Sequence, residues 1–224
     1  MPSLPPSQTP AEREAQAGRP GTRLTDGCVT GANGEMTVPR AVVLVEGNSD
    51  RVALHTLSRR SGRDLAAEGV EVVAMGGITN TRAFASRYGP HGLGVPLCGL
   101  YDAPEEAVLR SGLVAGGVAD ALGPAELSGL GFFGCRSDLE DELIGALGIE
   151  GVEAVIEAAG ETQSLRLLAG MPAQRHWTRR AVLRRFLGVR AGRKARYAAL
   201  LAEALEPDRV PEPLAAVLAR SARL

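Results

Sequence analysis

The sequence predicts an α/β fold: a mostly parallel four-stranded sheet with helices on both faces, followed by a helical C-terminal region. Apolar runs of strand length recur along the first part of the chain, and each precedes a segment with helical periodicity. Strand and helix alternate four times within about 110 residues. From residue 150 onward the apolar pattern is helical only. This alternation is typical of an open sheet built from strand–helix–strand units.

Length and composition restrict the possible classes of protein. The chain has 224 residues, of which 45% are hydrophobic, so it can bury a sizeable core. Its formal net charge of −1 excludes a uniformly basic surface. Three cysteines without a CxxC spacing argue against a disulfide framework or a zinc ribbon. No apolar run approaches the ~20 residues of a membrane span, and no secretory leader pattern is present, so we expect a cytoplasmic protein that does not enter the membrane.

The first elements can be predicted in chain order. Residues 1–38 are rich in Pro, Gly, Ser and Thr and have no apolar period, which predicts disorder. The apolar run 41–45 predicts a strand that is covered on both faces. After Glu46, either Asn48 or Ser49 is expected to cap a helix.

The remaining elements divide the chain into two further parts. The alternating part is expected to span residues 39–148, and a helical C-terminal region residues 149–224. The later predicted elements are strand 70–75, a glycine turn at 76–80, helix 82–88, strand 95–101, helix 104–114, strand 130–135 and helix 137–147.

Acidic side chains follow three of the four predicted strands. Ligands of open α/β sheets bind beyond the carboxyl ends of the strands, so these acids should meet at one edge. Crowded carboxylates repel one another unless a cation neutralises them, and oxygen ligands favour Mg²⁺ or Mn²⁺. The acids are Glu46, Asp50, Asp102, Glu105, Glu106, Asp138, Glu140, Asp141 and Glu142.

Each acid taken alone has an alternative explanation. Carboxylates are common at helix N-termini, where the helix dipole stabilises them. Ser137 and Glu140 have the spacing of a capping box, which would account for Glu140 without a metal. Asp141 and Glu142 would simply be solvated. What these alternatives do not explain is the repetition of acids after the first, third and fourth strands.

Several motifs resemble those of Toprim domains. The run Val43-Leu44-Val45-Glu46-Gly47-Asn48-Ser49-Asp50 is similar to the first Toprim motif, in the E-G-x-[ST]-D form of the OLD-type (overcoming lysogenization defect) endonucleases. Asp102 matches the first acid of the DxD motif, and Gly76-Gly77 resembles the intervening glycine turn. Asp138-Leu139-Glu140 resembles the acidic segment after the fourth strand. The resemblance covers residues 41–148.

The resemblance implies a Rossmann-like Toprim fold and a site that binds one or two Mg²⁺ or Mn²⁺ ions. It implies that Glu46 is a metal ligand or acid/base, that Asp50 and Asp102 are ligands, and that Asp138 or Glu140 completes a second site. The second acid of DxD falls at Pro104, which has no ligating side chain. Glu105 or Glu106 is expected to replace it, and Glu106 is included in the predicted ligand set.

A basic block follows an acidic one in the C-terminal half. Residues 162–202 contain Arg and Lys but no acid, whereas residues 137–161 contain acids but no base. An Arg-rich helix face would bind a phosphate backbone; alternatively, the basic helices dock on the acidic ones. Trp177, Phe186 and Tyr197 lie within the basic block, where they serve either as core residues or as base-stacking platforms.

Lys194 is the only lysine in a chain whose other basic residues are arginines. Its compact charge suits stabilisation of a developing phosphate charge. In its order along the chain it resembles the downstream catalytic lysine of OLD-type nucleases, so Lys194 joins Glu46 as a predicted catalytic residue.

These residues and motifs therefore favour a metal-dependent endonuclease that hydrolyses phosphodiester bonds of nucleic acid, DNA rather than RNA. The alternative is a non-catalytic Toprim-fold module that binds nucleic acid or protein, which the Pro104 departure favours. No G-x-x-x-x-G-K-[ST] motif occurs, and the single lysine excludes a P-loop, so a stand-alone module or a separate ATPase subunit is expected. Homo-oligomerisation is a further possible property.

Overall fold

The computed structural model describes residues 29–30, 36–120, 126–188 and 191–224. The chain divides into two compact units, Met1–Thr37 and Val38–Leu224. In the first unit, β1 (Val29–Thr30) pairs with β2 (Met36–Thr37) in an antiparallel manner. The disorder predicted for residues 1–38 otherwise concerns residues outside the described ranges.

The second unit is built on a four-stranded parallel sheet with the order β4-β3-β5-β6. The first strand in sequence, β3, lies in the interior of the sheet, where Val43 pairs with Val72 on one side and Cys98 on the other. This confirms the predicted parallel α/β sheet. The strands are β3 (Ala41–Val45), β4 (Val70–Ala74), β5 (Leu97–Asp102) and β6 (Phe132–Cys135).

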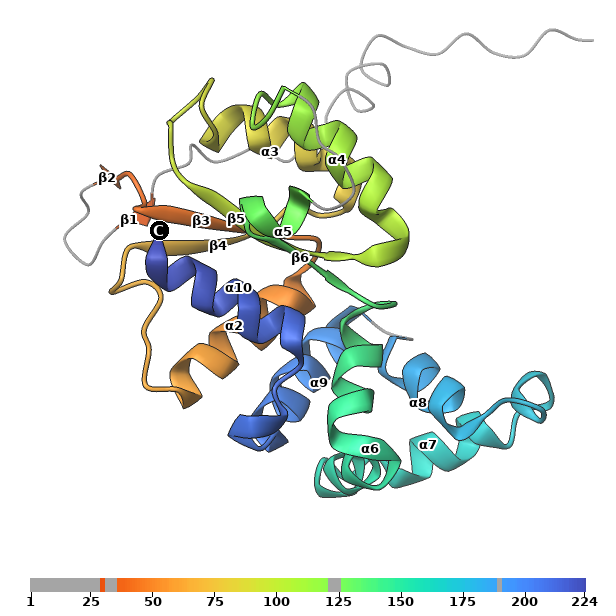
Figure 1. The fold of residues 1–224 in the computed structure, drawn as a ribbon. Helices are drawn as coiled ribbons and strands as arrows, with labels where there is room; N and C mark the ends of the chain where they lie inside the picture. The colour runs from red at the N-terminus through yellow and green to blue at the C-terminus, as the bar shows by residue number, and fades with distance from the viewer. Residues whose placement is uncertain (1–28, 31–35, 121–125, 189–190) are drawn as a thin grey trace, which may run out of the picture. The chain divides into compact units, whose positions relative to one another are not determined.

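The alternation of side chains along β3 fills two cores, one on each face of the sheet. Val43 and Val45 belong to the core that includes α2 (Asn48–Arg60), whereas Val42 and Leu44 belong to the opposite core. Figure 1 shows α3 (Thr81–Tyr88) and α4 (Glu106–Ala115) on that opposite face. Because both faces are covered, every residue of β3 is buried, which explains its continuous apolar sequence.

The fourth strand begins later than predicted. Glu126–Leu130 forms a short helix, α5, and Leu130 therefore ends a helix instead of opening a strand. Gly131 has a positive φ of 96°, and its carbonyl accepts from Gly99 N at 3.1 Å, so the chain turns there before β6 starts at Phe132.

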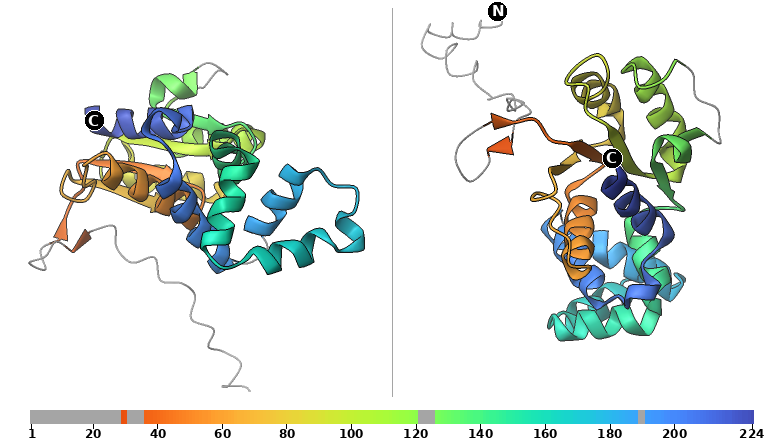
Figure 2. Two further views of the ribbon diagram at one scale, coloured as in Figure 1. Left: turned by 90° about the horizontal axis from the view of Figure 1, so that it is seen from below. Right: turned by 60° about the vertical axis from the view of Figure 1, so that its left-hand side comes forward.

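The C-terminal helices complete the same compact unit. Helix α6 (Leu139–Ala158) is interrupted at Gly148, whose φ of 76° and ψ of 167° are not helical. Figure 2 shows α7 (Thr162–Ala169) and α8 (Arg179–Gly188) beside α6 and away from the sheet. The division at residues 148 and 149 stays a prediction, since helices from both parts share one core.

Two later helices return to the sheet. Helix α9 (Ala191–Ala204) packs against α2, and α10 (Glu212–Arg223) packs against β5 and β6 (Figure 1). Short 3₁₀ helices are η1 (Ile78–Asn80), η2 (Ala103–Glu105), η3 (Pro172–Gln174) and η4 (Pro207–Arg209). In the described part of the chain, no helix has both the length and the apolar character to cross a bilayer.

Substitution of Gly99 in β5 tests how closely the strands and side chains pack around it. A Cβ at this position would lie 2.5 Å from the Leu44 carbonyl oxygen and 2.8 Å from the Phe132 ring. We expect Gly99→Ala to lower the free energy of unfolding by about 1–3 kcal/mol. Gly129→Ala is the control, because a Cβ there meets nothing within 4 Å. Denaturant unfolding measures both; equal stability of the two variants would contradict the described packing.

Candidate metal centre

Three carboxylates converge beyond the carboxyl ends of two neighbouring strands. Glu46 directly follows β3, Asp102 is the last residue of β5, and Glu105 ends η2. One carboxylate oxygen from each lies within 4.8 Å of the others. Parallel pairing of β3 with β5 places both strand ends at the same edge of the sheet.

A glycine turn holds the backbone of Glu46. The amides of Gly76 and Gly77 donate to the Glu46 carbonyl oxygen at 2.9 and 3.1 Å. Both glycines have positive φ values, 73° and 123°, which residues with a Cβ rarely adopt. The glycine pair after β4 therefore positions the first acid of the site.

A 3₁₀ turn brings Glu105 beside Asp102. Asp102 precedes η2, Pro104 lies in its first turn, and side chains three residues apart in a 3₁₀ helix eclipse one another. Glu106 makes other contacts. Its carboxylate pairs with Arg110 and accepts a hydrogen bond from the Tyr101 hydroxyl at 3.3 Å. The structure thus brings Glu105, and not the expected Glu106, to Glu46 and Asp102.

Asp50 lies at the start of α2 and is almost fully buried. Its Oδ2 accepts from the Gly47 amide at 2.9 Å, and Gly47 is the N-cap, so the expected caps at Asn48 and Ser49 are wrong. The carboxylate closes the first turn of the helix and adds negative charge beside the three converging acids.

Asp138 and Glu140 already have cationic partners. Asp138 is the N-cap of α6, with Oδ1 accepting from Asp141 N at 2.8 Å and Oδ2 2.5 Å from Arg184. The predicted capping box at Ser137 is therefore wrong. Glu140 is buried, its Oε2 lies 3.5 Å from Lys194 Nζ, and its Oε1 has no hydrogen-bond partner among the described residues. Their role as metal ligands stays a prediction.

Burial and mutual repulsion raise the pKa values of these acids. Burial, followed by a hydrogen bond and charge repulsion from Glu105, raises the pKa of Glu46 to about 7. Burial and then the charges of Asp50 and Glu46 raise the pKa of Asp102 to about 7. Burial is also the main reason why the pKa values of Asp50 and Glu140 are raised.

Lys194 opposes this repulsion. Partial burial by itself lowers the pKa of Lys194, but the charges of Glu140, Asp50 and Asp102 outweigh it, so its pKa is raised. In turn, Lys194 favours the charged forms of Glu46, Asp102 and Glu140. The predicted catalytic lysine therefore lies within electrostatic reach of the predicted metal ligands.

Most of the basic block docks on the acidic block, as one of the two alternatives predicted. Phe186 and Tyr197 are core residues, whereas Trp177 remains 44% exposed. The side chains of Arg166, Arg175 and Arg185 have no ion-pair or hydrogen-bond partner among the residues that the structure describes. The ion pairs are Arg179–Glu153, Arg180–Asp141, Arg184–Asp138, Arg193–Glu161, Arg196–Glu161 and Lys194–Glu140.

The three converging residues fit a hard divalent ion. All offer carboxylate oxygens, the ligand type that Mg²⁺ and Mn²⁺ prefer. Burial and the neighbouring Glu105 raise the pKa of Glu46, and a cation bound among the three carboxylates would offset this repulsion. Glu46, Asp102 and Glu105 would hold such an ion.

Comparison with known proteins identifies the type of domain that carries these residues. Residues 39–103 match the family model described as "Overcoming lysogenization defect protein-like, TOPRIM domain". The chain is similar to the C-terminal region of the Xanthomonas campestris pv. campestris OLD protein phased with mercury (25% identity, TM-score 0.63, covering 84% of this chain and 97% of that chain). The same region phased with platinum gives 26% identity and a TM-score of 0.64, with 83% and 93% covered.

A second organism provides a similar fold. The C-terminal region of the Burkholderia pseudomallei OLD protein is 21% identical, with a TM-score of 0.62, covering 84% of this chain and 98% of that chain. No curated protein gives a significant match. The predicted OLD-like Toprim domain is thereby confirmed.

The raised pKa values predict how stability depends on pH in metal-free protein. Glu46 and Asp102 have pKa values of about 7 when folded, against ordinary values of 4.5 and 3.8. Between these values the folded state binds more protons than the unfolded state, so stability falls as pH rises towards 7. After allowance for solvent screening we expect a loss of about 1 kcal/mol, or about 2–4 °C in Tm.

Thermal unfolding in EDTA across pH 4.5–7.5 measures this loss, with the double variant Glu46→Gln/Asp102→Asn as the control. The variant should lose most of the pH dependence, and added Mg²⁺ should raise the Tm of wild type at pH 7.5. A wild-type profile that rises with pH would refute the described electrostatics.

Glu105 and Glu106 give a matched pair for testing the metal centre. We expect Glu105→Gln to weaken Mn²⁺ binding by at least tenfold, because it removes one of three converging ligands. Glu106→Gln should change it less than twofold, because Glu106 pairs with Arg110. Titration calorimetry measures both; the reverse order would restore Glu106 as the ligand.

Proposed function

We propose that this chain, which carries an OLD-like Toprim domain over residues 39–103, is a divalent-metal-dependent endonuclease that hydrolyses phosphodiester bonds in nucleic acid, preferably DNA. The observation that supports this most directly is the convergence of Glu46, Asp102 and Glu105 within 4.8 Å. Three carboxylates that repel one another at neutral pH form a cation site, and Lys194 adds a positive charge next to it.

Each side chain has a distinct part in the proposed reaction. Glu46, Asp102 and Glu105 would hold a divalent ion and orient the scissile phosphate beside it. Such an ion would supply activation of the attacking water and stabilisation of the leaving oxygen. Lys194 donates hydrogen bonds to a non-bridging phosphate oxygen and stabilises the charge that develops there. Glu140 holds the Lys194 ammonium group in place and keeps it protonated.

One ion is the arrangement that the geometry supports best. A second ion at Asp138 and Glu140 would have to displace Arg184 and Lys194 from these carboxylates. The Pro104 departure from DxD, which motivated the non-catalytic alternative, does not remove the third carboxylate, because Glu105 takes that place. A separate ATPase subunit and self-association stay predictions.

Plasmid cleavage tests the proposed activity. We expect wild type to nick supercoiled DNA with Mg²⁺ or Mn²⁺ but not with EDTA, and Glu46→Gln or Asp102→Asn to reduce the rate at least 100-fold. Glu106→Gln is the acid-to-amide control outside the carboxylate cluster and should retain most activity. Metal-independent nicking, or full activity of Glu46→Gln, would exclude this mechanism; no nicking by wild type would favour the non-catalytic module.

Lys194 allows a separate test of transition-state stabilisation. We expect Lys194→Ala to lower the cleavage rate at saturating DNA by about 10²–10³-fold, the usual effect of losing one charged donor. DNA binding should weaken far less, because Lys194 is one cation among several in this region. Comparing single-turnover rates with fluorescence anisotropy separates the two quantities; equal losses in both would make Lys194 a binding residue only.

A further inference from the structure

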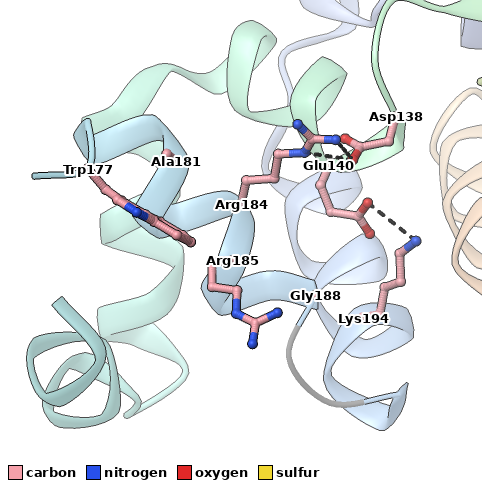
Figure 3. A pocket seen from close by; sticks show the side chains of 8 residues that line it. All are labelled: Asp138, Glu140, Trp177, Ala181, Arg184, Arg185, Gly188 and Lys194. Atoms are coloured by element: carbon pink, nitrogen blue, oxygen red, sulfur yellow. Dashed lines mark hydrogen bonds and ion pairs between the residues drawn. The ribbon is translucent and has the colours of Figure 1, made fainter. Parts of the chain in front are cut away.

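A pocket of about 400 Å³ lies among the C-terminal helices and is lined in part by Lys194, whose charge acts on Glu46 and Asp102. Figure 3 shows the Glu140–Lys194 pair at one end and Trp177, just before α8, at the other. Ala181 and Gly188, which have small side chains or none, line the pocket between these two ends. Its volume lies within the usual range for sites that bind small organic groups.

Trp177 provides an exposed aromatic surface in this pocket. Its side chain is 44% exposed, whereas Phe186 and Tyr197 in the same basic block are each only 1% exposed. A large indole left this open covers no core, and its flat face is available to a flat ligand. Of the aromatic residues in the basic block, Trp177 therefore has the exposure of a stacking platform.

Arg185 supplies a positive charge that the protein leaves unneutralised. Of the pocket's cations, Arg184 pairs with Asp138 and Lys194 pairs with Glu140. Arg185, one residue further along α8, has no such partner within residues 36–120, 126–188 and 191–224. Arg185 and Trp177 line the same pocket, so an aromatic face and a free guanidinium are presented together (Figure 3).

We propose that this pocket binds one unpaired nucleotide of the substrate strand, with its base against Trp177 and its phosphate on Arg185. A nucleotide combines a flat base with a negative phosphate, which matches both features. The inference rests on the proposed function and deepens it: Lys194 lines the pocket and also acts electrostatically on Glu46 and Asp102, so a strand anchored here would lead its neighbouring phosphate towards the carboxylates.

This arrangement makes the site selective for nucleic-acid structure. A base in a duplex is stacked and paired on both sides, and exposing it to Trp177 would cost a few kcal/mol. A single strand, a frayed end or a flap already has bases free to stack on an aromatic side chain. The pocket therefore favours single-stranded over duplex segments and has little preference among sequences.

Tryptophan fluorescence tests the proposal directly, because Trp177 is the only tryptophan in the chain. The probe is a fifteen-nucleotide oligo(dT), about the length of a few single-strand binding sites, titrated in EDTA so that binding is observed without cleavage. We expect strong quenching of Trp177, with an affinity at least tenfold higher than for a duplex of the same length. Binding by anisotropy without quenching, or equal affinity for the duplex, would overturn the proposal.

Substitutions separate stacking from general electrostatic attraction. We expect Trp177→Ala to weaken oligo(dT) binding about tenfold, as loss of one base–aromatic contact does, while Trp177→Phe keeps most of the affinity. Arg185→Ala should weaken it similarly and lower the salt dependence by about one phosphate contact. Arg166→Ala is the matched control, an arginine on α7 outside the pocket. Equal effects of Arg166→Ala and Arg185→Ala would refute the site.

The outcomes distinguish this inference from the proposed nuclease activity. Quenching without any metal-dependent cleavage would support the nucleotide pocket while removing the hydrolase. Metal-dependent cleavage with unaltered Trp177 fluorescence, and with unchanged affinity of Trp177→Phe and Trp177→Ala, would support the hydrolase and exclude the nucleotide pocket. If both Trp177 variants instead lost a dimer seen in sedimentation with no change in oligo(dT) binding, the pocket would be a protein contact, and the inference would be wrong.

Discussion

Repulsion among carboxylates at the edge of the sheet is the constraint on which the rest of the site depends. Glu46, Asp102 and Glu105 present oxygens within 4.8 Å of one another, and partial burial reduces the screening of their charges by water. Such a cluster is tolerable when it is protonated or when a cation lies within it. Lys194 offsets part of the negative charge of the cluster. A divalent cation would neutralise the negative charge that remains.

The backbone around the cluster prevents the acids from moving apart. The Glu46 carbonyl accepts two hydrogen bonds from the turn after β4, so this residue is tied to the neighbouring strand. Glu105 follows Asp102 within a single 3₁₀ turn. The hydrogen bonds to Glu46 and the 3₁₀ turn are both local features, but they act on residues that the parallel sheet places at one edge. The hydrogen bonds and the two cores that bury the strands thus hold the carboxylates together despite their repulsion.

The segregation of acidic and basic residues along the chain has mainly a structural purpose. Arginines of α8 pair with Asp138 and Asp141 at the start of α6 and with Glu153 further along it, and Arg193 of α9 pairs with Glu161 just before α7. Exposed pairs of this kind contribute little to stability individually, but they orient α8 and α9, which carry Arg185 and Lys194, and the segment just before α8 that contains Trp177. Because Arg184 and Lys194 are paired, Arg185 is the cation of the pocket that has no side-chain partner among the described residues.

The sequence by itself determined the parallel α/β sheet, its strand-end acids and the OLD-like Toprim character, because these depend on local periodicity and on motifs of contiguous residues. That Glu46 and Asp102 meet at one edge of the sheet could be predicted for the same reason. Only the tertiary structure decided between Glu105 and Glu106, since that choice rests on a 3₁₀ turn and on the capture of Glu106 by Arg110. The tertiary structure also decided which arginines are paired and that Trp177 is exposed. Ion pairing and burial depend on residues distant in sequence, and the composition does not show which of these residues come into contact.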